Sequence, residues 1–217
     1  MARLIGILSL LLLVVTMSAQ EKLSTRQLTR KNGLYVEKYY AMASDTSVKH
    51  GQYQMMYKGR DIEKGEYRNG ARVGRWKFYN LSNEIEFVYD YDTGTPHQII
   101  KHKGAKYGDN TYPSMFLGSP IRPYHFITHY TYYPVKESEN REDCQVVLVL
   151  EISSDGDMVG YHIDKSSKPE FNRVVLEAAS KMPRDWKWVP ARFEGKKVAS
   201  EYCITIVFEA VEDEVNE

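Results

Sequence analysis

The sequence predicts an α+β protein in two parts: an N-terminal all-β module of hairpin repeats and a small C-terminal α+β domain. Over residues 33–103, glycines precede aromatic residues at recurring intervals, which is typical of short hairpins. From about residue 119 onward, the patterns run in the order helix, β-hairpin, helix and closing β-strand. Residues 104–117 lose this periodicity and gain Gly, Asn and Pro, so we expect domains at 20–107 and 108–212.

The composition is that of a globular protein without a surplus of either charge. The 217 residues are 42% hydrophobic and 27% charged, and Lys+Arg and Asp+Glu balance at 29 each. Because no basic surplus exists to hold a phosphate backbone, we expect no nucleic-acid partner. The 17 tyrosines favour strands with half-buried faces over helix bundles.

The first 19 residues have the pattern of a secretory signal peptide. Arg3 supplies a positive charge, residues 4–15 form an apolar run, and small residues precede the expected cleavage site after Ala19 or Gln20. The run is short for a membrane span, so we expect cleavage and export to the periplasm. An uncleaved membrane anchor is the alternative. At the other end, residues 213–217 form a short acidic tail.

Aromatic residues recur two positions after glycines in the first part. The aromatic residues of these Gly-x-aromatic units are Tyr53, Tyr67 and Trp76. Asn69-Gly70 is a turn signal because both residues tolerate positive φ. We therefore expect short hairpins in which the aromatic stripe of one hairpin is covered by the next.

Residues 65–79 follow the pattern G-x-Y-x-N-G-x-x-x-G-x-W-x-x-Y, and this spacing resembles the MORN-like repeats of antitoxin-type modules. The resemblance covers about residues 33–103, with degenerate flanking copies at 32–40 and 84–94. It implies an interaction surface and no chemistry. The candidate aromatic face of that surface consists of Tyr53, Tyr67 and Trp76.

The spacing of apolar residues predicts the helices and strands of the second part. Residues 119–134 predict a short helix bounded by prolines, with Phe126, Ile127 and Tyr130 inward. Two strands surround Asp155-Gly156, a strong hairpin signal. The inward residues expected for these strands, for the second helix and for the closing strand are Val146, Leu148, Leu150 and Ile152, then Phe171, Val174, Val175, Ala178 and Met182, then Tyr202, Ile204, Ile206 and Phe208.

Several motifs of the second part occur in a fixed order. They are Tyr133-Pro134, the Asp155-Gly156 hairpin, an amphipathic helix and the exit Trp188-x-Pro190-Ala191. In this order they resemble the TonB C-terminal domain family over about residues 112–210. The resemblance implies that the closing strand, residues 200–208, is a sheet edge beside the first strand.

Three residues after the second helix are expected to have structural roles. Trp188 supplies an apolar plug for the helix end, and Pro190 forces the residue before it out of the helical region. Gly195 permits a tight turn before the last strand.

The chain has no sequence signature of an enzyme, since HExxH, GxSxG, P-loop and CxxC patterns are absent from it. We expect no catalytic residues, no metal and no cofactor. His125 and His129 have the i,i+4 spacing of a metal pair, but no third ligand lies nearby in the sequence. The two cysteines are expected to be free, because strand alternation points Cys144 inward and Cys203 outward.

These features predict a non-enzymatic, protein-binding adaptor of the bacterial envelope that takes an extended peptide at the edge of the closing strand. The outward residues of that strand are Glu201, Cys203, Thr205 and Val207. In the family that it resembles, the peptide belongs to outer-membrane transporters, so we expect a protein partner in the envelope.

Two alternatives remain: an accessory component of TonB-dependent transport, and an antitoxin-like repeat protein. A full TonB-type energy transducer carries a membrane anchor and a long Pro-rich spacer, whereas this chain has only 8 prolines. The partner and the oligomeric state stay open.

Overall fold

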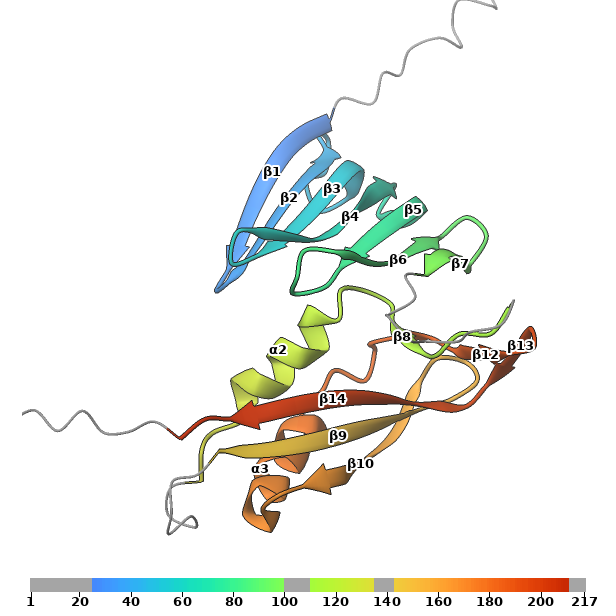
Figure 1. The fold of residues 1–217 in the computed structure, drawn as a ribbon. Helices are drawn as coiled ribbons and strands as arrows, with labels where there is room; N and C mark the ends of the chain where they lie inside the picture. The colour runs from blue at the N-terminus through green and yellow to red at the C-terminus, as the bar shows by residue number, and fades with distance from the viewer. Residues whose placement is uncertain (1–24, 100–109, 135–142, 211–217) are drawn as a thin grey trace, which may run out of the picture.

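The computed structural model describes residues 25–99, 110–134 and 143–210, and Figure 1 shows their arrangement. An antiparallel sheet forms the N-terminal part, and an α+β unit forms the C-terminal part. This confirms the predicted fold class. The predicted signal peptide, the domain boundary at 107/108 and the acidic tail lie outside the described residues.

The N-terminal sheet is a meander in which each strand pairs with the next one along the chain. All of its pairings are antiparallel, and several contain register shifts. Its seven strands are β1 (Thr25–Asn32), β2 (Tyr35–Met42), β3 (Lys49–Tyr57), β4 (Arg60–Arg68), β5 (Ala71–Tyr79), β6 (Ile85–Asp90) and β7 (Thr95–Ile99). The sheet agrees with the predicted hairpins, while membership of the MORN-like class stays a prediction.

The predicted turn at Asn69-Gly70 joins β4 to β5. Both residues have positive φ, at 51° and 82°, which is the backbone of a two-residue turn that suits the right-handed strand twist. Asn and Gly adopt this conformation at low steric cost, so the local sequence alone determines the turn.

The aromatic stripe of the meander is buried by the second part of the chain. Trp76, Phe78 and Phe87 are fully buried, and Met115 and Val189 belong to the same apolar cluster. The expectation that each hairpin covers the stripe of its neighbour was therefore wrong. The hairpins lie side by side in one sheet, so the cover must come from another layer.

The C-terminal unit has the predicted order of helix, hairpin, helix and closing strand. Its main elements are α2 (Ile121–Tyr130), β9 (Cys144–Ile152), β10 (Met158–Ser166), α3 (Pro169–Ser180) and β14 (Ser200–Phe208). The sheet order is β10-β9-β14, so β14 is an edge strand beside the first strand of the unit, as predicted.

Alternation along the strands of this sheet places one set of side chains in the core. Val146, Leu148 and Leu150 of β9 are fully buried, together with Phe171 and Val175 of α3. Ile127 of α2 joins the same cluster. Tyr130, predicted to point inward, is instead 43% exposed, because it is the last residue of α2 and lies beyond the core.

Two short strand pairs complete the unit. They are β8 (Met115–Phe116) with β11 (Trp188–Val189), and β12 (Ala191–Phe193) with β13 (Lys196–Val198). Gly195 has a φ of +79° in the turn between β12 and β13. The turn therefore precedes β13, and not β14 directly as the sequence suggested.

Candidate binding edge and the contact between the two parts

The four residues proposed for peptide recognition lie on the exposed face of β14. Glu201, Cys203, Thr205 and Val207 are all exposed, and they alternate with buried or half-buried neighbours. Figure 1 shows β14 at the border of its sheet, on the side of α2 and the N-terminal sheet. Position and exposure together make this strand the candidate site.

The direction of the backbone groups of β14 follows from two hydrogen bonds at its ends. The Ser114 hydroxyl, which is not part of the sheet, donates to the Glu201 carbonyl at 3.1 Å. The Ala210 N–H donates to a carboxylate oxygen of Asp143, the residue before β9, at 3.0 Å. Successive residues of a strand direct their N–H and C=O to opposite sides. Odd-numbered residues therefore face the free edge, and even-numbered residues face β9.

This alternation leaves a row of backbone groups available along the edge. Cys203, Thr205 and Val207 each direct an N–H and a C=O away from β9, and β14 pairs with no other strand in the described part of the chain. Such a row is the template to which an extended chain can add.

A groove of about 340 Å³ lies beside the first half of this edge. Tyr202 to Thr205 form one side of the groove, and the start of α2 with the loop between β5 and β6 forms the other. Burial raises the pKa of the Tyr202 hydroxyl, with a further contribution from Glu86.

Cys203 places an exposed thiol at the edge, and its surroundings suppress the ionisation of that thiol. Partial burial raises the pKa of its thiol, and the Glu201 and Asp164 carboxylates raise it further. Cys144 is buried and Cys203 exposed, and both are free thiols. The prediction that the two do not form a disulfide is confirmed.

The three residues of the proposed aromatic face lie in one packed cluster. Tyr53 and Trp76 are buried, while Tyr67 is half-buried. The ring centroids of Tyr67 and Trp76 are 5.1 Å apart in an edge-on arrangement, and Lys49 Nζ lies 5.3 Å from the Tyr67 ring. Tyr67 is thus the member of this face that reaches the surface.

Trp188 and Pro190, two of the three predicted structural residues, lie against the hairpin turn between β9 and β10. The Trp188 N–H donates to the Gly156 carbonyl at 2.9 Å, and Trp188 is buried in the core. A Cβ on Gly156 would lie 2.1 Å from the Trp188 carbonyl oxygen, so only glycine fits there. Pro190 follows the extended residues of β11.

A buried carboxylate joins the two parts of the protein, and no sequence pattern predicted it. Glu63 of β4 is fully buried and accepts hydrogen bonds from Arg72 at 3.0 Å and from Arg122 of α2 at 3.4 Å. The backbone N–H of Ser119 donates to the same carboxylate at 3.2 Å, and the Ser119 hydroxyl donates to the Tyr79 carbonyl at 2.7 Å.

His125, the first histidine of the pair in α2, packs against Tyr35 and Tyr57 of the N-terminal sheet. A hydrogen bond of 3.0 Å joins His125 Nδ1 to the Tyr35 hydroxyl, and the rings of His125 and His129 lie 5.9 Å apart. The described residues contain no group of three or more His, Cys, Asp or Glu side chains arranged to hold a metal ion. They also contain no helix that is long and apolar enough to cross a membrane.

Fold and edge together define a class: a small α+β domain with an open edge strand, joined to a β-meander. In the C-terminal part, residues 129–210 match the family described as the Gram-negative bacterial TonB protein C-terminal. The match supports a TonB C-terminal domain in this part of the chain, and this family belongs to the Gram-negative envelope. Searches found no match to the chain among curated proteins or among solved structures.

Proposed function

We propose that this protein is an exported, non-enzymatic adaptor of the Gram-negative envelope that binds an extended segment of a partner protein at the free edge of β14. The observation that carries the proposal is the hydrogen bond from Ser114 to the Glu201 carbonyl. This bond indicates that the odd-numbered residues of β14 direct their N–H and C=O groups away from β9. The partner would add as a further strand, with its backbone paired to Cys203, Thr205 and Val207.

Affinity and specificity would come from different groups at this edge. Backbone pairing supplies affinity to any extended chain, whereas the exposed side chains of β14 and the groove beside Tyr202 select the sequence that binds. The groove wall has both apolar surface, from Ile121 and Tyr124, and the Glu86 carboxylate. It therefore suits a segment with alternating apolar and polar residues.

A role in TonB-dependent transport is the second candidate function, and the family match at residues 129–210 favours it. In that role the bound segment would belong to an outer-membrane transporter, and a separate protein would supply the motor. The apolar run at residues 4–15 bears on the choice, because a cleaved signal peptide favours the free adaptor and a retained anchor favours the transport component.

Proline at Thr205 tests the edge directly, because Pro has no N–H to donate. We expect Thr205→Pro to fold, since this N–H faces away from β9, and to lose the envelope partners that co-purify with the wild type. Thr205→Ala is the matched control, because it shortens the side chain and keeps the N–H, so backbone pairing survives.

The fold of each variant is checked by its thermal unfolding transition. If Thr205→Pro has no native transition, Val207→Pro, one residue from the strand end, makes the same test. A folded proline variant that retains every partner would overturn the proposal. The aromatic face around Tyr67 would then be the better candidate.

A further inference from the structure

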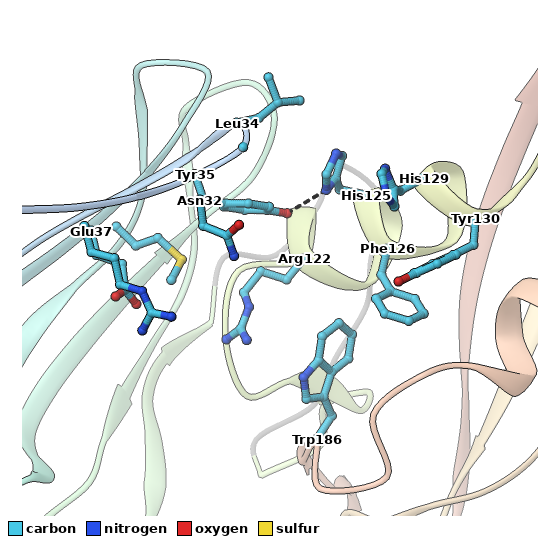
Figure 2. Close-up of a pocket in the computed structure, with 13 residues that line it drawn as sticks. Asn32, Leu34, Tyr35, Glu37, Arg122, His125, Phe126, His129, Tyr130 and Trp186 are labelled. Carbon is cyan, nitrogen blue, oxygen red and sulfur yellow. Dashed lines mark hydrogen bonds between the residues drawn. The ribbon is translucent and has the colours of Figure 1, made fainter.

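A second cavity lies between the N-terminal sheet and helix α2, and the proposed function does not use it (Figure 2). Its volume is about 620 Å³, which is in the range of sites for small organic molecules. One wall is the end of β1 with the β1–β2 turn and the start of β2, and the other is α2. Trp186, from the segment after α3, closes one side.

Aromatic rings line this cavity in contact with one another. The Phe126 ring lies 4.8 Å from the Tyr130 ring and 5.5 Å from Trp186, measured between centroids. On the opposite wall, Tyr35 packs edge-on against His125 at 5.3 Å. These flat surfaces favour a ligand with an apolar, planar body.

The charged groups of the cavity leave an excess of positive charge. Among the described residues, Glu37 is the one carboxylate that lines the cavity. It accepts from the Tyr53 hydroxyl at 2.8 Å, pairs with Lys49 at 3.4 Å and lies opposite Arg30 in the β1–β2 pairing, so one carboxylate faces two cations. Arg122 shares the single Glu63 carboxylate with Arg72, so one guanidinium charge of this group is not balanced.

Arg30, on β1, adds a second cation at the rim of the cavity. His125 adds little charge at neutral pH, because burial and the neighbouring His129 and Lys58 lower its pKa. Burial also raises the pKa of Tyr35 to about 12, so this hydroxyl stays neutral. The cavity thus combines two guanidinium groups with a ring-lined interior.

We propose that this cavity binds a small organic anion: a molecule with a carboxylate held between Arg30 and Arg122, and a planar apolar body against Phe126 and Trp186. A guanidinium forms paired, charge-assisted hydrogen bonds with a carboxylate. In such a complex the ligand contacts the N-terminal sheet and α2 at once, so it links the two parts of the protein.

The test compares two probes of equal size that differ in charge, 1-naphthylacetate and the neutral 1-naphthylacetamide. Binding is followed by the NMR signals of the indole N–H groups of the 3 tryptophans, with Trp186 assigned from its loss in Trp186→Phe. We expect the carboxylate to shift the Trp186 signal saturably and to bind roughly tenfold more tightly than the amide.

The matched variants are Arg30→Gln and Arg26→Gln, which remove the same charge from the same exposed strand. Of these two arginines, only Arg30 lines the cavity. Arg30→Gln should therefore weaken the binding of 1-naphthylacetate roughly tenfold, while Arg26→Gln should change it less than about twofold. Arg122 is left intact because its removal would also disturb the Glu63 contact.

Three results would overturn the proposal. They are no saturable shift of Trp186 up to the solubility of the carboxylate, equal affinity for carboxylate and amide, and equal weakening by the two arginine variants. Equal weakening would mean that binding of the anion depends on the total positive charge of β1 and not on Arg30 in the cavity.

Discussion

Gly65 of β4 lies directly against the Trp76 ring, in a place where the aromatic core has no room for a side chain. A Cβ at this position would lie 2.2 Å from Cδ2 of the fully buried Trp76 ring, which has no space to move. The Trp76 indole N–H also donates to the Glu66 carbonyl at 3.2 Å, so the ring lies flat across the backbone of β4. Glycine is therefore needed for close approach.

We expect Gly65→Ala to lower the free energy of unfolding by about 2 kcal/mol or more, since overpacking a closed core costs roughly that amount. Gly160→Ala is the control: a Cβ there meets the end of the exposed Glu151 side chain, which can move away. Its effect should stay within about 0.5 kcal/mol. Urea denaturation measures both, and equal midpoints for the two variants would show that the Trp76 ring has room to adjust.

For single residues, the backbone conformation of turns could be predicted from the sequence, whereas side-chain partners far away in the chain could not. Asn69-Gly70 forms the predicted turn because both residues carry the required φ preference. Glu63 has no comparable signal, since its sequence neighbours include other charged residues and register shifts interrupt the alternation of β4. Its partner Arg122 lies in the second part of the chain, so only the tertiary fold brings the two together.

At the scale of elements, period-two alternation correctly predicted which side chains of β14 lie inward. It could not predict which residues direct their backbone toward the free edge, because that depends on the pairing with β9 and on Ser114, far away in the sequence. For α2, the helix itself was predictable, but Tyr130 was wrongly predicted to be inward, since helical spacing does not show where the core ends.

The backbone alternation of β14 predicts an alternating pattern of amide hydrogen exchange. The N–H groups of Ile204 and Ile206 are bonded to β9 and should exchange at least roughly tenfold more slowly than those of Cys203 and Thr205. NMR hydrogen exchange on the free protein measures this. A pattern shifted by one residue, with Thr205 protected and Ile204 not, would contradict the proposed edge.

For the whole molecule, the Glu63 carboxylate is one of the contacts that join the two parts, together with the apolar cluster around Trp76. Glu63 lies in β4 and accepts hydrogen bonds from Ser119, just before α2, and from Arg122 in the first turn of α2, while Arg72 completes the group. The sequence predicted two separate parts with a boundary between them. Their contact could not be predicted, because a single sequence does not show which charges pair across it.

Loss of this carboxylate should destabilise the whole protein. Glu63→Gln leaves the guanidinium groups of Arg72 and Arg122 without their counter-charge, and breaking a buried ion pair from one side costs about 3–5 kcal/mol. Glu151→Gln is the control, because its contact with His162 is exposed and contributes about 1 kcal/mol at most. Urea denaturation of both variants gives the comparison, and a loss below about 1 kcal/mol for Glu63→Gln would show that Glu63 is not needed to join the parts.

The most direct measurement of the central claim, that partners bind at the edge of β14, is site-specific photo-crosslinking in intact cells. A photoreactive amino acid replaces Val207 on β14, which is 56% exposed, or Val159 on β10, which is 67% exposed at the opposite edge of the same sheet. We predict a discrete cross-linked envelope protein from position 207 that disappears when Thr205→Pro is added, and none from position 159. Cross-linking from position 159 alone, or from position 207 regardless of Thr205→Pro, would contradict the account.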